Sequence, residues 1–593
     1  MNRWSDIPLR SDLLLQYLID IQQSESFVCP EAVERLSTDL SIPVSQIKSV
    51  IAFYSFLHSR ARGHFDILFS DNIIDQMAGS RALLQQLCQQ LGVEQGKPRA
   101  DGRVTIDTTS CTGMSDQGPA MLVNNIPLTR LDRQRIEQIA EYVEQDKPLA
   151  QWPEELFEVH DNIRRADILL TENTQDGDAL HALCEEGADT LLQRIDDSGL
   201  RGRGGAGFKT ATKWRLCRQV QAQQHIVVCN ADEGEPGTFK DRVLLQSYSA
   251  QVIEGMSLCA GIIGARKGFI YLRAEYFYLL DALHQELQRR RDENLLGERI
   301  LGQAGFDFDI EIHLGAGAYI CGEESALLES LAGRRGIPQK RPPFPVEHGY
   351  LGYPTVVNNV ETLMAACQIA SHGGDWFSDK GTRQSSGTKL LSISGDCHLP
   401  GIYEYPMGTS VSEILIDCGA QETQAVQVAG AAGQTLCQRE FKRRIAMEDA
   451  STGGSFMIFN RQRDLLDMVQ NFAHFFAHES CGFCTPCRVG SSLICNLVDK
   501  LYTSHATQND LRDIERIALV MRHASHCGLG ATASNHILDT FNNFPDSYQR
   551  RLRSSEYTPA FDLDGAVSEA RAITGRDDAA AHIPGSSAQE CEP

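Results

Sequence analysis

The chain has 593 residues, of which 42% are hydrophobic, enough for roughly three or four domains with substantial cores. Its 55 basic and 78 acidic residues give a net charge of −23, which argues against nucleic acid or an anionic membrane surface as the main partner. The 18 cysteines are scattered along the chain, a usage typical of thiols and metal ligands rather than of a disulfide framework.

The N-terminal stretch MNRWSDIPLRSDLLLQYLID reads as a mature helix, because acidic residues interrupt its apolar periodicity and no small-residue cleavage site follows. The best apolar candidate for a membrane span, MSLCAGIIGA, is shorter than the roughly 18 residues required and is flanked by Glu254 and Arg266. We therefore expect a soluble, cytoplasmic protein without membrane insertion.

The first part of the chain divides into three segments. Residues 1–62 predict a helical segment, with helices over Ser11–Ser24, Pro30–Thr38 and Ile42–Tyr54. Residues 63–147 predict a small thioredoxin-like α/β unit: the strand HFDILFS, a helix over Ser80–Leu91, the strands GRVTIDTTS and AMLVNN, and a helix over Leu131–Glu144. Residues 148–178 read as a connector rich in proline and charge.

The remainder predicts three further domains and a tail. Residues 179–386 alternate helices and strands (HIVVC, GFIYLRA, FDIEIHL), which is typical of an α/β domain. Residues 387–460 show short strands separated by glycine turns, and residues 461–555 are strongly helical. The tail, residues 556–593, is expected to be partly disordered, with Cys591 as an exposed thiol.

A glycine-rich loop, GLRGRGGAGF, occupies positions 199–208. Gly202, Gly204 and Gly207 match G-x-G-x-x-G, but the loop follows a predicted helix instead of the strand that the dinucleotide fingerprint requires. Glycines beside two arginines nevertheless suit a loop whose backbone N–H groups approach phosphate. The alternative is a flexible surface loop.

Two more polar loops follow predicted strands of the same domain. The strand HIVVC runs into NADEGEPGTFKDR (230–242), and FDIEIHL runs into GAGAYICGEESALLES (315–330). Open α/β sheets bind ligands beyond the carboxyl ends of their strands, so the three loops predict a shared pocket, although each alone could be a capped turn. The carboxylates of these loops can bind ribose hydroxyls and would repel an extra 2′-phosphate, so NAD is favoured over NADP.

The stretch ESCGFCTPCRVG carries Cys481, Cys484 and Cys487 at two-residue spacings. This spacing is more typical of an iron–sulfur site than of zinc, although zinc remains the main alternative. The fourth ligand is either Cys495, inside an apolar helical pattern, or Cys527, in SHCGLGA. We predict Cys527, because Gly528 and Gly530 allow the backbone to approach a sulfide closely, and we expect its side of a 4Fe-4S cluster to face the exit toward a partner.

These motifs, together with KWR, PPFP, NNVET and CGLG, resemble in their order the flavoprotein of the NADH dehydrogenase module of respiratory complex I, over residues 195–544. The form most like this chain is the diaphorase subunit of cytoplasmic NAD-reducing nickel–iron hydrogenases, in which a unit like the small 2Fe-2S subunit precedes the flavoprotein. The resemblance implies an α/β multidomain fold: a Rossmann-like FMN/NAD domain, a ubiquitin-like β-grasp domain and a C-terminal helical bundle with the cluster.

The resemblance also implies the cofactor residues. FMN would be held by Gly202, Gly204, Gly205, Lys213, Asn230, Asp232, Glu233, Tyr319, Gly322, Glu323, Asn358 and Asn359. NAD(H) would contact Phe208, Glu235, Glu324 and Phe344, and Arg341 stands where the family has lysine, so its contact changes donor geometry.

The N-terminal unit departs from the family. Ser70, Asp75 and Ser115 occupy three of the four expected cysteine positions, and only Cys111 remains, so we predict a scaffold that binds no 2Fe-2S cluster. The predicted function is reversible hydride transfer between NAD(H) and FMN, with single electrons passing through the 4Fe-4S cluster to a small iron–sulfur diaphorase subunit and on to nickel–iron hydrogenase subunits. Alternatives are the equivalent subunit of an NAD-dependent formate dehydrogenase or of complex I, or a metal-binding assembly scaffold with a degenerate nucleotide pocket.

Overall fold

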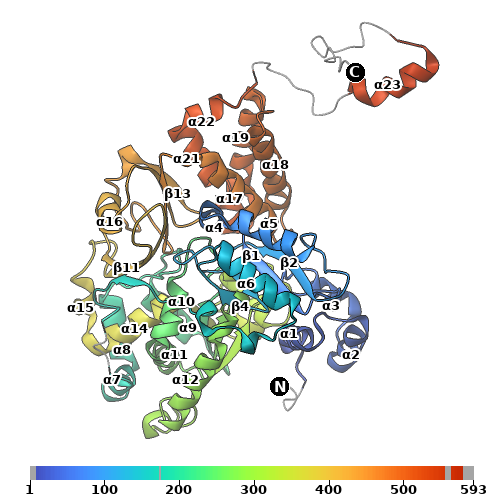
Figure 1. Ribbon diagram of the computed structural model, residues 1–593. Helices are drawn as coiled ribbons and strands as arrows, with labels where there is room; N and C mark the ends of the chain where they lie inside the picture. Colours follow the sequence, from blue (N-terminus) through green and yellow to red (C-terminus); the bar gives the residue numbers. More distant parts are fainter. Residues whose placement is uncertain (1–8, 172–174, 554–562, 578–593) are drawn as a thin grey trace.

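The computed structural model of the chain describes residues 9–171, 175–553 and 563–577 (Figure 1). Figure 1 also shows α23 (Leu563–Thr574) apart from the main body. The tail predictions for 556–562 and 578–593, including Cys591, lie outside the described residues, as do the first eight residues of the predicted N-terminal helix. Within the described ranges, no helix has the length and apolar character that crossing a membrane requires.

The N-terminal segment forms α1 (Leu14–Glu25), α2 (Pro30–Leu40) and α3 (Val44–Ile51). Its contacts run mainly to the large α/β domain. Gln16 donates a 2.9 Å hydrogen bond to the backbone carbonyl of Leu314 and accepts one of 3.1 Å from the N–H of the same residue. The hydroxyl of Tyr54 donates to Ser330 Oγ at 2.7 Å. The segment therefore extends the core of the α/β domain.

The thioredoxin-like unit has a four-stranded sheet in the order β2-β1-β3-β4. Its elements are β1 (Phe65–Ser70), α4 (Ile73–Met77), α5 (Ser80–Leu91), β2 (Val104–Thr109), β3 (Met121–Val123), β4 (Ile126–Leu128) and α6 (Arg133–Glu144). β1 pairs parallel with β2 and antiparallel with β3, as the strand–helix–strand–strand–helix pattern predicts. Residues of α5 and α6 complete the core of the unit.

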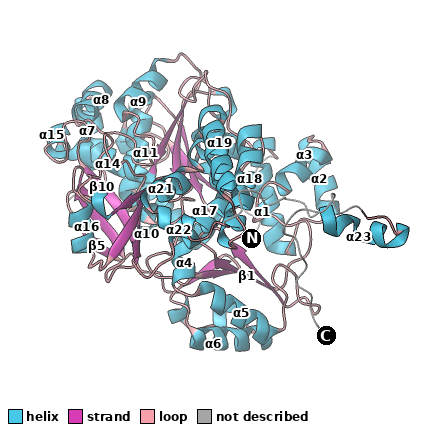
Figure 2. Ribbon diagram, turned by 90° about the horizontal axis from the view of Figure 1, so that it is seen from above, coloured by secondary structure: helices cyan, strands magenta, loops and turns pink. Residues whose placement is uncertain are grey.

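The large α/β domain contains a four-stranded, fully parallel sheet in the order β8-β7-β6-β9. The strands are β6 (Ile226–Ala231), β7 (Lys267–Leu272), β8 (Asp309–Leu314) and β9 (Thr355–Asn359), and the helices include α7 (Asp178–Glu186), α8 (Ala188–Asp197), α9 (Thr210–Gln219), α10 (Lys240–Ser247), α11 (Ser249–Ile263), α12 (Leu280–Asp292), α13 (Glu324–Leu331) and α14 (Val360–His372). Figure 2 shows helices on both sides of the strands. The predicted single helix near Ala179–Asp196 is two helices, because Gly187 at φ 87° interrupts it.

Two sets of side chains alternate along β6 and explain why its first four residues, Ile226–Cys229, are all apolar. Ile226 and Val228 pack with the N-terminal segment and α13, whereas Val227 and Cys229 pack with α11 and α14. A parallel strand covered on both faces has no polar side. The carboxyl ends of all four strands therefore meet at one buried edge, where the loops carry the polar groups.

The β-grasp domain has a six-stranded sheet in the order β13-β12-β14-β10-β11-β5. It comprises β10 (Thr388–Gly395), β11 (Gly401–Pro406), α16 (Val411–Asp417), β12 (Thr423–Val428), β13 (Gln434–Cys437) and β14 (Ser455–Asn460). Of these elements, α16 was not expected from the strand and turn pattern. The edge strand β5 (Ile163–Arg165) comes from the predicted connector, whose backbone N–H groups at Asp167, Leu169 and Leu170 bind the Glu404 carboxylate.

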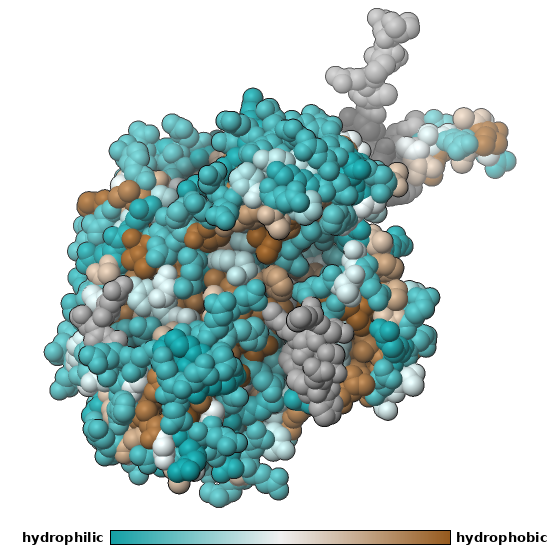
Figure 3. Space-filling view, turned by 60° about the horizontal axis from the view of Figure 1, so that its bottom comes forward, coloured by the Kyte–Doolittle hydropathy of each residue, from teal (hydrophilic) through white to brown (hydrophobic). Residues whose placement is uncertain are grey.

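The C-terminal bundle contains α17 (Leu465–Glu479), α18 (Thr485–Tyr502), α19 (Gln508–Ala524), α20 (Gly528–Thr532), α21 (Asn535–Asn543) and α22 (Pro545–Gln549). Helices therefore make up most of residues 465–549, and residues 554 and 555 of the predicted helical domain lie outside the described residues. On the face drawn in Figure 3, hydrophilic side chains predominate and hydrophobic ones form separate patches, in keeping with the acidic composition.

Candidate functional site

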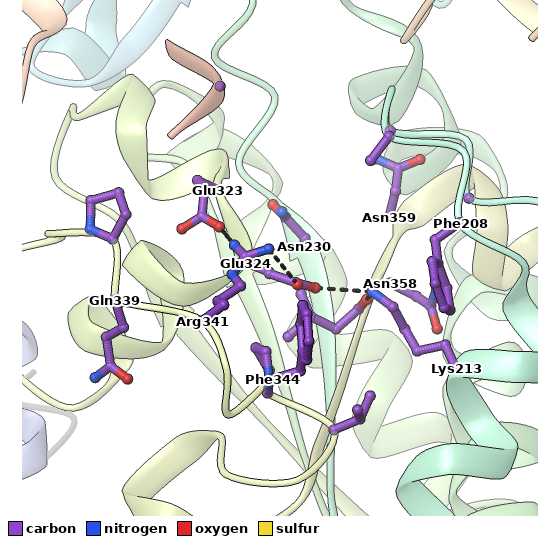
Figure 4. Close-up of a pocket in the computed structure, with 18 of the residues that line it drawn as sticks. Phe208, Lys213, Asn230, Glu323, Glu324, Gln339, Arg341, Phe344, Asn358 and Asn359 are labelled. Carbon is purple, nitrogen blue, oxygen red and sulfur yellow. Dashed lines mark hydrogen bonds and ion pairs between the residues drawn. The ribbon is translucent and has the colours of Figure 1, made fainter. Parts of the chain in front are cut away.

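A cavity of about 1060 Å³ opens where the carboxyl ends of β6 and β9 meet the glycine-rich loop (Figure 4). This is the edge at which parallel α/β sheets bind ligands. The volume reaches the upper end of the range of roughly 300–1,000 Å³ found for ligand pockets. The cavity is therefore large enough for a cofactor and a substrate side by side.

Most of the predicted cofactor residues line this cavity: Gly202, Gly204, Phe208, Lys213, Asn230, Gly322, Glu323, Glu324, Arg341, Phe344, Asn358 and Asn359. Phe208 and Phe344 are about half exposed, so their rings are available to a ligand. The other five, Gly205, Asp232, Glu233, Glu235 and Tyr319, are not among the lining residues. The surroundings of Asp232, Glu233, Glu235 and Tyr319 are described below with their loops.

The glycine-rich loop closes on itself and leads directly into α9. The N–H of Gly202 donates a 2.9 Å hydrogen bond to the carbonyl of Phe208. A Cβ on Gly204 would lie 3.2 Å from the Asn359 Cβ, so glycine allows the loop to approach the end of β9. The loop follows α8 rather than a strand, which confirms that it is not a dinucleotide fingerprint of the usual kind.

Charged side chains form a chain across the mouth of the cavity (Figure 4). The Arg341 guanidinium pairs with Glu323 and, from Nη1 at 3.2 Å, with Glu324 Oε1. Lys213 Nζ lies 2.9 Å from Glu324 Oε2. The Glu323 carboxylate also caps α13 by accepting from the N–H groups of Ser325 and Ala326. Arg341 thus bridges two carboxylates, a contact for which its forked guanidinium is better suited than a lysine ammonium.

The acidic residues after β6 have different surroundings. Glu233 accepts hydrogen bonds from the N–H groups of Asp241 and Arg242 at the start of α10 and from the Tyr276 hydroxyl at 2.8 Å, and burial raises its pKa to about 7. Asp232 differs: its Oδ2 is buried without a hydrogen-bond partner among the described residues, and burial raises its pKa. An orphaned buried acceptor beside the cavity fits a bound donor group.

Glu235 and Tyr319 lie at the junction of three domains. The Tyr319 hydroxyl donates to Glu235 Oε2 at 2.5 Å, and the N–H of Ala432 in the β-grasp domain donates to Glu235 Oε1 at 3.1 Å. Burial raises the pKa of Glu235 to about 7. In this structure Glu235 therefore joins the α/β domain to the β-grasp domain, and it is not among the residues that line the cavity.

A buried charge cluster beneath Asn359 was not predicted from the sequence. Lys240 Nζ donates to Asn359 Oδ1 at 3.1 Å, and Asn359 Nδ2 donates to Asp241 at 2.6 Å. Glu361 pairs with both Lys240 and Lys389, all three fully buried. Lys240 and Glu361 belong to the motifs FKDR and NNVET, which is the only signal that could have identified them. The cluster fixes the orientation of the Asn359 amide at the cavity wall.

Cys481, Cys484, Cys487 and Cys527 line a second, small cavity in the helical bundle. Cys484 is the N-cap of α18, Cys487 lies in its first turn, and Cys527 is the N-cap of α20. A Cβ on Gly530 would lie 2.8 Å from the Cys487 Cβ, so this glycine permits the close approach of α20. Cys495 is not among the lining residues. Four converging thiols are a donor set that fits an iron–sulfur cluster.

Single-ion zinc fits these thiols poorly. The four sulfurs of a zinc site lie roughly 3.8 Å apart, given Zn–S bonds of about 2.3 Å. Within the described residues, the one group of three or more candidate ligand atoms within 4.8 Å of one another is His474, Cys495 and Asp499, not the cysteine quartet. The wider spacing of the quartet favours a multi-iron cluster.

Cys527 lies between the two cavities. Together with His526 and Gly528, it lines the large cavity, and it lines the small one as well. We expected this cysteine's side of the cluster to face the exit toward a partner. The structure places Cys527 at the large cavity, whereas Phe483, which also lines the small cavity, is 55% exposed. The two cavities are thus adjacent.

Three of the four expected ligand positions of the thioredoxin-like unit, Ser70, Asp75 and Cys111, meet in a buried hydrogen-bond network, whereas Ser115 Oγ is buried without a partner among the described residues. Asp75 accepts from Ser70 Oγ at 2.7 Å, from Asn72 Nδ2 at 2.6 Å and from the N–H of Ala120 at 3.0 Å. Asn72 Nδ2 also donates to Cys111 Sγ at 3.3 Å. With a single thiol, this donor set does not fit a 2Fe-2S cluster.

Comparison with known proteins gives three family matches along the chain. Residues 195–368 match the Nuo51 FMN-binding domain, residues 3–144 match the thioredoxin-like 2Fe-2S ferredoxin family, and residues 467–551 match the NADH-ubiquinone oxidoreductase-F iron-sulfur binding region. The first and third matches fall on the large α/β domain and the helical bundle, and the second spans the N-terminal helical segment together with the thioredoxin-like unit.

The similar proteins include hydrogenase and NADH-quinone oxidoreductase subunits. The NAD-reducing hydrogenase HoxS subunit alpha of Cupriavidus necator is 42% identical over 93% of this chain and 94% of that protein. A subunit of the NADH-quinone oxidoreductase of Aquifex aeolicus is 37% identical over 66% of this chain and 93% of that protein. A crystal structure of NAD+-reducing NiFe-hydrogenase in the H2-reduced state has a chain with a TM-score of 0.89 and 42% identity, covering 96% of this chain and 99% of that chain.

Proposed function

The chain belongs to the family of NAD-reducing hydrogenase alpha subunits, and from that premise we propose that it is the diaphorase subunit of such an enzyme. It is an NAD-dependent oxidoreductase that uses FMN and a 4Fe-4S cluster. The observation that carries the proposal is the position of Cys527, which lines both the large cavity and the cysteine cavity. A cluster bound by Cys527 would therefore lie next to a cofactor in the large cavity.

When bound, FMN exchanges hydride with NAD(H) as an electron pair and exchanges single electrons with the cluster. The side chains position these groups. The orphaned Asp232 Oδ2 offers an acceptor, and Asn358 and Asn359 offer amides held by Trp214 and by the Lys240–Asp241 pair. The exposed rings of Phe208 and Phe344 offer stacking surfaces for the substrate, and the Arg341 fork offers donors to its polar groups.

The acidic mouth favours NAD(H) over its phosphorylated form. Glu323 and Glu324 place two carboxylates at the start of α13, balanced by Arg341 and Lys213. An added 2′-phosphate would have to compete with these carboxylates for the same two cations. The three ion pairs therefore support NAD as the substrate.

The thioredoxin-like unit serves as a scaffold without a 2Fe-2S cluster. Ser70 and Asp75 are hydrogen-bonded to each other and to Asn72, and Cys111 supplies a single thiol. The unit contributes contacts to the flavoprotein instead: Arg273 Nη2 donates to the Cys111 carbonyl at 2.6 Å, and Arg242 Nη2 pairs with Asp116 at 3.0 Å. The former ligand loop thereby supports the loop that carries Glu233.

The partners are a small iron–sulfur diaphorase subunit and, through it, nickel–iron hydrogenase subunits, and the location is the cytoplasm. The match to the hydrogenase alpha subunit spans 93% of the chain, whereas the match to the Aquifex aeolicus NADH-quinone oxidoreductase spans 66%, which supports the hydrogenase assembly over complex I. All cysteines among the described residues are free thiols, which suits a reducing compartment.

Visible absorption and metal analysis of the purified full-length chain test this function. We expect flavin bands with a broad iron–sulfur shoulder, both bleached by NADH, and iron and sulfide no greater than one 4Fe-4S cluster holds. A colourless protein would contradict the enzyme assignment. Iron and sulfide beyond one such cluster would instead contradict the scaffold role of the thioredoxin-like unit.

A further inference from the structure

Three different metal-ligating side chains meet between α17 and α18, outside the site described above. Cys495 and Asp499 lie one turn apart on the same face of α18, and His474 projects from α17. Their ligand atoms all lie within 4.8 Å of one another. His474 Nε2 is 2.9 Å from Asp499 Oδ1, to which Gln470 Nε2 also donates at 2.8 Å. The helices thus bring a nitrogen, a sulfur and an oxygen ligand together.

This donor set selects the class of metal. Magnesium and calcium prefer oxygen ligands alone, and an iron–sulfur cluster requires several thiolates. One imidazole, one thiolate and one carboxylate suit a late first-row dication, of which Zn²⁺ is the usual one at tetrahedral sites. Ligand atoms around zinc lie roughly 3.3–3.8 Å apart, and the three ligand atoms here already lie within 4.8 Å of one another. Three protein ligands leave the fourth position for water.

The exposure of the three side chains and their distance from the cysteine cavity also fit a metal site separate from the cluster. The side chains of His474 and Asp499 are 54% and 39% exposed, whereas Cys495 is 8% exposed, so an ion can enter from the side of the imidazole and the carboxylate. Cys495 follows Cys487 by eight residues of α18, a rise of about 12 Å, and it does not line the cluster cavity. The two groups of ligands are therefore distinct.

Binding of a dication would release the proton of the Cys495 thiol. Burial raises the pKa of Cys495 to about 11, so the thiol is protonated at neutral pH without a metal. A dication that forms a bond to Sγ displaces this proton to solvent, while His474 and Asp499 bind without a change of oxidation state. The step needs no oxidant or reductant.

We propose that His474, Cys495 and Asp499 form a binding site for one zinc-type dication that joins α17 to α18. The loop between these helices, 480–484, carries Cys481 and Cys484 of the cluster. An ion between the helices therefore restrains both ends of the cluster loop. The site gives Cys495 a role separate from the cluster that it adjoins in sequence.

The test uses the full-length, cluster-loaded protein. After exposure to one equivalent of Zn²⁺ and gel filtration, we expect one zinc per chain with unchanged iron, and X-ray absorption at the zinc edge should show one sulfur with nitrogen and oxygen neighbours. Cys495→Ser and His474→Gln should each weaken zinc binding about tenfold or more. The control Cys437→Ser removes a buried thiol that pairs with Glu440, and it should bind zinc as the wild type does.

Three results would overturn the proposal. Equal zinc binding by Cys495→Ser, His474→Gln and the wild type would mean adventitious surface binding only. A zinc edge without a sulfur neighbour would lead to the same conclusion even if the variants fail to fold. Loss of iron in proportion to the zinc gained would show that zinc enters the cysteine quartet.

Discussion

The backbone N–H of Tyr319 donates a 3.0 Å hydrogen bond to Glu479 Oε2 and so joins the loop after β8 to the end of α17. The other oxygen of the same carboxylate accepts from Ser110 Oγ at 2.7 Å, which brings in the thioredoxin-like unit. Cys481 follows two residues later. One half-buried carboxylate therefore positions the cluster loop against the loop that borders the large cavity.

Replacing Glu479 should slow electron transfer from the flavin to the cluster but not the reduction of the flavin by NADH. Glu479→Ala leaves the Tyr319 N–H without its acceptor, at a cost of about 1–3 kcal/mol, and loosens the cluster loop. We expect electron transfer from flavin to cluster to slow about tenfold, while NADH reduces the flavin within about twofold of the wild-type rate. Stopped-flow absorption resolves the two signals.

Ser110→Ala is the matched control, because it removes one partner of Glu479 and leaves the bond from Tyr319 in place. It should have a smaller effect than Glu479→Ala. Equal slowing of flavin and cluster reduction in Glu479→Ala would show that the carboxylate acts on the whole fold and not on the cluster loop.

Arg341→Lys should raise the KM for NADH by about three- to tenfold with kcat within about twofold. The ammonium keeps the charge but cannot bridge Glu323 and Glu324 as the guanidinium does. Steady-state kinetics with an artificial acceptor measure the effect. Arg334→Lys, which alters a pair with Glu329 outside the large cavity, is the control. A fall in kcat at unchanged KM would place Arg341 in the chemical step instead of in binding.

His536 should make the helical bundle sensitive to acid. Burial between Phe472 and Phe476 lowers the pKa of His536 to about 3 from its ordinary value of 6.5. Below pH 6.5 the unfolded chain therefore takes up a proton that the folded chain does not, and stability falls. At pH 5 the loss is about 2 kcal/mol.

The comparison of wild type with His536→Phe isolates this contribution. The midpoint of heat-induced loss of cluster absorbance is measured between pH 7.5 and pH 5. The wild-type midpoint should fall more steeply with acid than that of His536→Phe, whose ring does not titrate. Parallel curves would assign the acid sensitivity to other groups.

Asp75→Ala should destabilise the thioredoxin-like unit by roughly 2–4 kcal/mol, because Ser70, Asn72 and the N–H of Ala120 lose a buried acceptor. Thermal unfolding measures the change, and the exposed Asp71→Ala is the control. We expect NADH oxidation by the folded fraction to stay within about twofold. If Asp75→Ala is as stable as the wild type, the hydrogen bonds to Asp75 do not stabilise the thioredoxin-like unit.

Local patterns in the sequence were sufficient for much of the fold and for most of the site. The glycine-rich loop, the strand ends and the cysteine spacing involve neighbouring residues, and the structure brings twelve of the predicted residues to one cavity wall. The family resemblance supplied the order of these motifs and the identity of the cofactors.

Long-range contacts account for what was missed. β5 has three residues and becomes a strand only because Ile163 pairs with Ile402. Cys527 follows a residue that contacts the large domain, because His526 Nε2 lies 3.0 Å from the Pro338 carbonyl oxygen. The buried pair of Lys389 and Glu361 joins two domains, so neither residue has a neighbour in sequence that indicates its partner.

An anaerobic NADH titration followed by electron paramagnetic resonance tests the central claim, that electrons from the large cavity leave through a cluster bound by Cys527. In the wild type and in Cys495→Ser, NADH should bleach the flavin and produce the signal of a reduced 4Fe-4S cluster. In Cys527→Ser the flavin should bleach without that signal. A full cluster signal in Cys527→Ser, or its loss in Cys495→Ser alone, would contradict the account.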